Sequence, residues 1–249
     1  MMNPAEFANI AAAERDLWWY RGMLRILSAV LQPYLSGRTL RRVLEAGCGT
    51  GYYSSLMQRQ GWPMYPVDLS SEGLRYAREL GVERLAQADI AALPFRDAAF
   101  DLAISLDVLV HFPPGEETRA LAELARVVHP GGLVVLRVSA LDLLRSRHSQ
   151  FALERQRFTR KRLIRQAGKA GIRVLRCTYA NALLLPVALA KFRIWEPLTG
   201  QPPASGVKPV SPWLDHLLYI PLWLESKWIG AGLGFAAGQS LVLIGERAI

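Results

Sequence analysis

Residues 43–52 read VLEAGCGTGY, and this stretch decides the fold. The apolar, β-branched run at residues 42–46 predicts a buried parallel strand that stops at Gly47. Glycines at alternate positions let the following turn bend tightly and bring its backbone close to a ligand. A helical stretch, residues 52–60, begins directly afterwards. The order of strand, Gly-rich turn and helix predicts that a helix N-terminus faces the ligand.

Strands and helices alternate through the rest of residues 41–179. The expected strands are 64–67, 84–88, 100–106, 133–138 and 172–178, and the expected helices are 71–80, 116–129 and 159–170. This alternation predicts βαβ units, a parallel sheet and right-handed crossovers. A last strand, residues 239–247, follows a helical excursion, and we expect it antiparallel at the sheet edge, beside the sixth strand. The fold class is therefore α/β, with a Rossmann-like, doubly wound sheet.

The same pattern divides the chain into three parts. Residues 1–38 predict an N-terminal helical cap, with one or two helices across residues 5–31. Residues 39–180 and 238–249 predict the ligand-binding core. Residues 181–237 predict a helical lid, interrupted by a Pro-rich loop, that is inserted before the last strand.

Composition fits a globular protein, with 51% hydrophobic and 20% charged residues. Cys48 and Cys177 lack metal-ligand spacing, so we expect reduced thiols in a cytoplasmic protein without a bound metal. The N-terminus does not resemble a signal peptide, and no apolar stretch predicts a transmembrane helix. The net charge of +9 fits a nucleic-acid, lipid or anionic-substrate contact, and equally a solvated basic helix face.

Two carboxylates indicate what the Gly-rich turn binds. Asp68 ends the second strand, where a carboxylate can accept both ribose hydroxyls of a nucleoside. Asp89 ends the third strand, where it can accept an adenine amino group while Ile90 packs on the ring. The glycines of this chain form G-x-G-x-G, with the third at Gly51. A dinucleotide-binding turn has G-x-G-x-x-G, so this spacing disfavours a dinucleotide. A methyl-donor nucleoside is therefore favoured over NAD.

Five segments carry a resemblance to a known family: VLEAGCGTGYYS (43–54), VDLS (67–70), AQADIAALPF (86–95), FDLAISLDVLVHF (100–112) and LARVVHPGGLVVL (124–136). In this order and spacing they closely resemble the class I S-adenosylmethionine-dependent methyltransferases. The resemblance implies a seven-stranded mixed sheet, with S-adenosyl-L-methionine across the carboxyl ends of the first, second and fourth strands. By position it implies that the methionine portion is held by Glu45, Gly47, Gly49 and Gly51. It implies that the ribose is held by Asp68 and Leu69, and the adenine by Asp89 and Ile90. Leu106 and Asp107 would line the rest of the cofactor.

A narrower resemblance reaches both ends of the chain. Glu14 and the run WWYRG at 18–22 are similar to the N-terminal signature of a bacterial subgroup often associated with glycan, lipid or natural-product pathways. RQRFT at 155–159 and N-x-x-x-x-P at 181–186 match further segments of this subgroup, whereas residues 234–240 lack the expected proline. The subgroup implies a small-molecule acceptor.

Methyl transfer from a sulfonium is energetically downhill, so the enzyme mainly aligns the reactants and excludes water. A general base helps where the acceptor is a hydroxyl or an acidic carbon. His111, after the fourth strand, is the first candidate, although a histidine that only caps the loop 111–115 is equally consistent; His148 is the second. Tyr20 could close over the cofactor, and the guanidinium fork of Arg21 suits the methionine carboxylate.

The acceptor contacts are expected from the cap and the lid. Consecutive residues of a helix cannot share a face, so one aromatic of the run WWY, taken here as Trp19, should point into the cleft. Arg157 fits an anionic substrate or a solvated face, and Asn181 and Trp223 are further candidates. An aromatic inner wall of the lid, which suits a hydrophobic or ring-bearing acceptor, is predicted from Trp195, Trp213, Tyr219, Trp223 and Trp228. The same apolar surface also fits a homodimer or a peripheral membrane contact.

Three functions compete at this point. The first is methyl transfer to a small hydrophobic, glycosidic or natural-product acceptor. The second is a methyltransferase-fold protein that binds the cofactor but acts as a cyclase or a binding module. The third, a nucleic-acid methyltransferase, is disfavoured because residues 106–109 read LDVL where such enzymes carry an Asn/Asp-Pro-Pro-aromatic motif.

Overall fold

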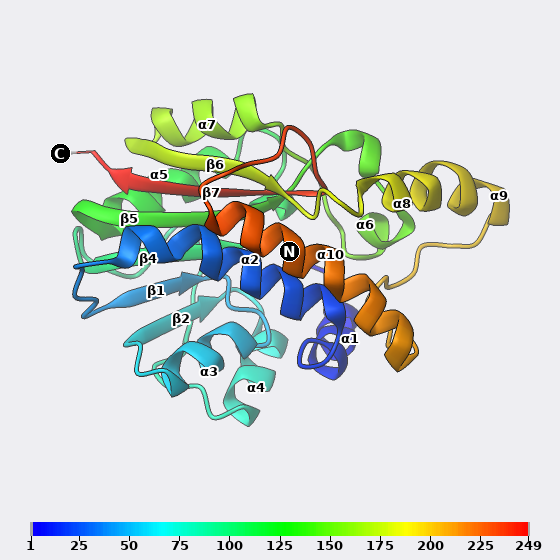
Figure 1. Cartoon of the computed structure of the whole chain (residues 1–249). Helices are drawn as coiled ribbons and strands as arrows, with labels where there is room; N and C mark the ends of the chain where they lie inside the picture. Colours follow the sequence, from blue (N-terminus) through cyan, green and yellow to red (C-terminus); the bar gives the residue numbers. More distant parts are fainter. Residues whose placement is uncertain (1, 249) are drawn as a thin grey trace.

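A seven-stranded sheet forms the centre of the computed structural model, which describes residues 2–248 (Figure 1). The strand order is β3-β2-β1-β4-β5-β7-β6. The strands are β1 (Val43–Ala46), β2 (Met64–Asp68), β3 (Ala86–Gln87), β4 (Phe100–Leu106), β5 (Val128–Ser139), β6 (Ile172–Ala180) and β7 (Ser240–Arg247). Strands β1 to β5 pair in parallel, and β7 pairs antiparallel with both of its neighbours. The predicted α/β fold with a seven-stranded mixed sheet is confirmed.

The position of β7 corrects the sequence analysis. We expected this strand at the sheet edge, but it lies between β5 and β6 and leaves β6 at the edge. Its residues from Leu241 to Ile244 are fully buried in succession. Because successive side chains of a strand point to opposite faces, such a run has to be covered on both faces, as an interior strand is.

Helices cover both faces of the sheet, as a doubly wound fold requires. One face packs against α2 (Trp18–Leu35), α3 (Tyr52–Arg59) and α10 (Pro212–Gly230). The other packs against α5 (Glu117–Val127) and α7 (Arg160–Lys169). The remaining helices are α1 (Pro4–Ala13), α4 (Ser71–Glu79), α6 (Arg147–Phe151), α8 (Leu185–Ala190), α9 (Glu196–Thr199), the 3₁₀ turns η1 (Leu109–His111) and η2 (Asp142–Leu144), and the π-helix η3 (Lys191–Trp195).

Two element boundaries differ from the prediction. The third strand, expected at residues 84–88, contains only the two residues of β3, and the chain around it forms turns. Helix α5 ends at Val127, and β5 already includes the Pro-Gly-Gly segment that we expected to separate them. Gly132 permits this, since a Cβ there would lie 2.9 Å from the carbonyl oxygen of Asp101 in the neighbouring chain segment.

The cap and the lid pack on each other beside the sheet. Helices α2 and α10 run side by side in the same direction (Figure 1): Trp18 meets Asp215 near their starts, and Gly22 meets Leu222 further along. A Cβ on Gly22 would lie 2.3 Å from the side chain of Leu222, so glycine is what lets the helices approach so closely. Within residues 2–248, no helix is long and apolar enough to cross a membrane.

Candidate functional site

A cavity of about 1090 Å³ lies at the carboxyl ends of the parallel strands, where ligands bind in open α/β sheets. The ends of β1, β2, β4 and β5 form its floor. Helix α1, the loop 204–208 and α8 close the opposite side. The cavity therefore joins all three parts of the chain that the sequence analysis defined.

The Gly-rich turn forms one wall of this cavity. Gly47 has a positive φ of 87°, and a Cβ there would lie 2.2 Å from the side chain of Val108. Gly47 and Gly49 line the cavity, as predicted, whereas Gly51 does not. Gly51 has the left-handed conformation at the start of α3, and a Cβ there would lie 2.5 Å from Ala77. Its role is thus to let α3 and α4 approach each other.

Asp68 connects the end of β2 to the Gly-rich turn. Its carboxylate accepts the backbone N–H of Gly49 at 2.7 Å and that of Ser70 at 2.8 Å. These bonds fix the orientation of the carboxylate, and each oxygen keeps a lone pair for a further donor. Because Asp68 lines the cavity, this geometry fits the predicted contact with two ribose hydroxyls.

Three carboxyl groups gather at this end of the cavity. Burial raises the pKa of Glu45 to about 8, although its carboxylate accepts a hydrogen bond from the Ser54 hydroxyl. Burial likewise raises the pKa of Glu14 to about 7, and it raises the pKa of Asp68. The negative charges of Glu14 and Asp68 add to the rise at Glu45. Ionising this cluster is costly without a compensating cation nearby.

This arrangement fits S-adenosyl-L-methionine, which carries two positive charges, on its ammonium and its sulfonium. Glu45 lines the cavity and can face a cationic group, while Asp68 can take the hydroxyls of the ribose. Asp89, Ile90 and Leu69 line the cavity at the ends of β2 and β3. Asp89 accepts the N–H of Ala91 at 2.8 Å, which fixes its carboxylate for the adenine contact that the resemblance implies.

Leu106 and Asp107 line the cavity at the end of β4. Asp107 has a positive φ of 60° and forms an ion pair with Arg137 at 2.6 Å. The Arg137 guanidinium also lies over the ring of Trp19, 5.2 Å from its centre. Trp19 lines the cavity, so this stack places the predicted aromatic of the cap against the cofactor side of the sheet.

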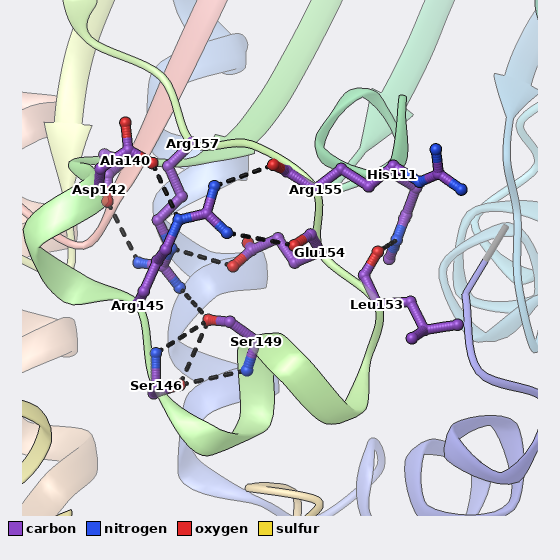
Figure 2. Close-up of polar contacts among 10 residues, drawn as sticks. All are labelled: His111, Ala140, Asp142, Arg145, Ser146, Ser149, Leu153, Glu154, Arg155 and Arg157. Atoms are coloured by element: carbon purple, nitrogen blue, oxygen red, sulfur yellow. Dashed lines mark hydrogen bonds and ion pairs between the residues drawn. The ribbon is translucent and has the colours of Figure 1, made fainter. Parts of the chain in front are cut away.

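His111, at the end of η1, also lines the cavity. Figure 2 shows its ring beside the carbonyl oxygen of Leu153, which lies 3.3 Å from Nδ1. A carbonyl can only accept, so Nδ1 carries the proton and Nε2 keeps its lone pair. Burial lowers the pKa of His111, which keeps the ring neutral at physiological pH. Both properties are those that a general base needs.

The two other catalytic candidates are less suited to proton removal. Tyr20 lines the cavity, but burial strongly raises the pKa of its hydroxyl, which therefore stays protonated. His148 also lines the cavity, and burial lowers its pKa. Its Nδ1 accepts the N–H of Gly206 at 3.1 Å and lies 3.5 Å from the carboxylate of Glu6. Because Nδ1 accepts this bond, Nε2 carries the proton in the neutral ring and has no lone pair for a substrate. His148 thus joins α1, α6 and the loop of the lid.

Arg157 lines the cavity but is engaged within the protein (Figure 2). It pairs with Glu154 at 3.0 Å, and it donates to the carbonyl of Ala140 and to the hydroxyl of Ser149. Arg155 lines the cavity too, and its backbone N–H donates to the carbonyl of Val110 at 2.8 Å, next to His111 in the sequence. Arg155 is therefore better placed than Arg157 to meet an anionic group near the candidate base.

Three expectations about the cap and the lid are not met. Arg21 does not line the cavity, because it pairs with Asp215 and lies over the ring of Tyr219. Trp223 does not line it either, and the predicted aromatic inner wall is wrong. The inner edge of α10 is aliphatic, formed by Leu214 and Leu218. The tryptophans that we expected inside are turned outward, with exposed fractions of 65%, 68%, 38% and 50% for Trp195, Trp213, Trp223 and Trp228.

Asn181 lies where it was predicted, at the cavity wall directly after β6. It is buried and has a positive φ of 53°. In the described part of the chain, its Oδ1 atom has no hydrogen-bond partner. A buried, unpaired acceptor at a cavity wall is costly unless a ligand donates to it, which supports the predicted substrate contact.

Sequence reasoning assigned no role to three residues that shape the site. Glu14 accepts the hydroxyl of Thr50 at 2.6 Å and so ties α1 to the Gly-rich turn. Arg137 is the ion-pair partner of Asp107, and Glu6 accepts the hydroxyl of Ser205 in the lid loop at 2.9 Å. A signal existed for Arg137, since it is a lone charge inside the apolar run LVVLRV.

Comparison with known proteins gives consistent results. Residues 44–136 match the sequence model of the family described as "Methyltransferase domain". A malonyl-[acyl-carrier protein] O-methyltransferase of Erwinia billingiae is 37% identical over 126 residues, which cover 50% of this chain and 49% of that protein. A ubiquinone biosynthesis O-methyltransferase of Xanthomonas oryzae pv. oryzae is 32% identical over 138 residues, or 50% of this chain and 57% of that protein. The chain thus spans about half the length of these curated relatives.

A solved structure extends the likeness to the whole fold. The S-adenosylmethionine-dependent methyltransferase of Thermotoga maritima described as a possible histamine N-methyltransferase superposes with a TM-score of 0.58 at 18% identity. The superposition covers 98% of this chain and 95% of that one. At this level of identity the likeness establishes the shared fold.

Proposed function

We propose that the protein binds S-adenosyl-L-methionine and transfers its methyl group to an oxygen of a small-molecule acceptor, which the match of residues 44–136 to a methyltransferase-domain model supports. The observation that carries the proposal is the cavity itself. It joins the glycine turn and the buried carboxyl cluster at one end to a neutral histidine and an aliphatic lid edge at the other. Both O-methyltransferase relatives support oxygen as the acceptor atom.

The bound cofactor supplies an activated methyl group on its sulfonium. Residues of this chain hold the donor: Asp68 accepts its hydroxyls, and the ionised form of Glu45 faces its positive charge. Helix α1 covers the Gly-rich turn through the bond between Glu14 and Thr50, and thereby excludes water. Where the acceptor is a hydroxyl, His111 accepts its proton at Nε2, while the carbonyl of Leu153 holds the ring in the tautomer that this requires. A carboxylate acceptor is already ionised and needs no base.

The acceptor end of the cavity favours an amphipathic molecule. Its aliphatic wall includes Leu184, Val187, Leu214 and Leu218. Basic side chains line the same region, among them Arg155, Lys191 and Lys208. An apolar body with a polar or anionic group fits both, and a malonyl thioester and a prenylated hydroxylated ring, suggested by the relatives' names, are the first acceptors to try.

The test uses S-adenosylmethionine with an isotopic label on its methyl group, incubated with these two acceptors and with an extracted metabolite pool. We expect the label in an organic product that carries it as the methyl group of an ester or an ether. Tight cofactor binding without transfer to any acceptor would contradict the proposal. It would favour the alternative hypothesis, in which the protein binds the cofactor but acts as a cyclase or a binding module.

The His111→Ala variant tests the base. We expect kcat to fall about 100-fold for a hydroxyl acceptor, because positioned general bases contribute at least that much. The affinity for S-adenosylmethionine should stay unchanged, as measured by calorimetry. Because burial lowers the pKa of His111, the wild-type rate should decline only below the pH range in which an ordinary histidine titrates. An unchanged kcat with a hydroxyl acceptor would remove His111 from the mechanism.

A further inference from the structure

The outer face of α10 carries a continuous row of exposed apolar side chains. Five of them recur every three or four residues and share one side of the helix, and the sixth, Trp223, flanks this row. The opposite side of α10 is buried through Leu222 and Ile229, which belong to the core beneath α2. We call the exposed row the α10 stripe, and its members are Trp213, Leu217, Ile220, Trp223, Leu224 and Trp228.

The acidic side chains of α10 point away from this stripe. Asp215 accepts the backbone N–H of Trp18 at 2.7 Å and pairs with Arg21. Glu225 is fully buried, and its carboxylate accepts the N–H of Leu183 at 2.7 Å. The charge beside the stripe is positive. Lys227 lies over the ring of Trp223, with Nζ 5.8 Å from its centre.

A second exposed apolar group lies at the same end of the molecule. Ile194, Trp195 and Leu198, on η3 and α9, are 60%, 65% and 78% exposed. Lys191 and Arg193 accompany them on η3. Figure 1 shows that α8, α9 and the first half of α10 project together beyond the strands, on the side where the lid covers the cavity. Both groups therefore combine tryptophan and leucine with basic side chains.

We propose that the α10 stripe docks on the surface of an anionic lipid bilayer. Tryptophan rings prefer the interface between lipid headgroups and acyl chains, and lysine and arginine beside them attract anionic lipids. The net charge of +9 provides the complementary long-range attraction. A second copy of the chain is a poorer occupant, because it would bring together two chains that each carry a net charge of +9.

Docking would also place the cavity next to the lipid. Leu214 and Leu218 lie on α10 between stripe residues and line the cavity wall. A bilayer against the stripe therefore lies one helix thickness from the acceptor end of the site. An acceptor with an apolar tail could pass between membrane and cavity without crossing water. The docking itself does not depend on methyl transfer, so the two proposals can fail separately.

The experiment is co-sedimentation of the full chain with vesicles of phosphatidylcholine alone or mixed with an equal part of phosphatidylglycerol. We expect binding to the mixed vesicles that is at least about tenfold stronger than to the neutral ones and that weakens with added salt. The triple variant Trp213→Ser, Leu217→Ser, Leu224→Ser should lose about tenfold or more of this binding. Lys227→Glu alone should weaken it by a smaller factor.

Leu143→Ser is the matched control, because Leu143 is 54% exposed on η2 and is not part of the α10 stripe. It should bind vesicles like the wild type. Circular dichroism and S-adenosylmethionine binding confirm that each variant is folded. Equal vesicle binding by the triple variant and the wild type would overturn the proposal. So would a lipid-free dimer that the triple variant converts to a monomer in sedimentation velocity while neither protein binds vesicles.

Discussion

The two ends of the cavity differ in the kind of side chain that forms them. At the donor end, polar groups are bonded to one another: Asp68 to Gly49, Glu45 to Ser54, and Glu14 to Thr50. At the lid end, α10 offers the cavity only aliphatic contacts and exposes its tryptophans to the outside. The donor is one fixed molecule, and a rigid, buried site can be built for it. The lid instead combines an apolar inner edge with an apolar outer surface.

This contrast means that substitutions at the two ends should affect different ligands. Donor-end changes should alter cofactor affinity, because their polar groups are buried and oriented. Lid changes should alter the handling of the acceptor and leave the cofactor untouched. The following variants test this separation.

Asp68→Ala should have the largest effect. Removing a carboxylate that accepts two ribose hydroxyls should weaken S-adenosylmethionine binding about 1000-fold, since each hydrogen bond to a charged group contributes about 1.5–3 kcal/mol. Isothermal calorimetry measures the loss. Glu72→Gln is the control, because Glu72 is an exposed residue of the adjacent α4 that pairs with Arg75. A loss below tenfold for Asp68→Ala would mean that the ribose lies elsewhere.

The double variant Leu214→Ser, Leu218→Ser should have an intermediate effect. Loss of two apolar contacts at the acceptor wall should raise the KM for an apolar acceptor about tenfold or more, since fully burying a leucine contributes about 1.5–3 kcal/mol. The dissociation constant of the cofactor should not change. In an assay without lipid, Leu217→Ser is a matched control on the same helix, because Leu217 faces outward and does not line the cavity. A change in cofactor affinity of similar size would break the separation between the two ends.

Glu45→Gln should have the smallest effect when the readout is the stability of the cofactor-free protein. Burial raises the pKa of Glu45 from its ordinary value of 4.5 to about 8, so the protonated form favours the folded state. Its stabilising contribution is full below pH 4.5 and is lost as the pH rises through about 8. The melting temperature of the free wild type should therefore decrease as the pH is raised from about 5.5 to about 8. The melting temperature of the variant should decrease less over the same range. Differential scanning calorimetry at both pH values measures this, and parallel slopes would argue against a buried, protonatable Glu45.

The core of the fold could be predicted because its signals are local. Residues 100–106 were predicted as a strand and form β4 with the same bounds. The position of β7 could not be derived from strand periodicity, since both edge and interior positions satisfy an antiparallel arrangement. Its uninterrupted apolar run was the signal, and weighing burial on both faces would have placed it correctly.

The donor site could largely be predicted, and the acceptor site could not. Asp68 and Asp89 were found because strand ends meet at one edge of a parallel sheet. The direction of the lid's aromatic side chains depends on how α10 rotates against α2, and the contact between Gly22 and Leu222 sets that rotation. Arg21 was misplaced for the same reason, as its partner Asp215 lies far away in the sequence. Long-range packing of this kind leaves no periodic signal in either segment.

The interior position of β7 also bears on how the chain folds during synthesis. Strands β5 and β6 are both complete well before residues 240–247 leave the ribosome, yet they pair with each other only through β7. Until then β5 presents an open edge and β6 has no partner strand in the sheet. Such contacts between distant segments form slowly and leave strand edges open to other chains. The nascent protein should therefore be most prone to aggregation just before its last strand emerges.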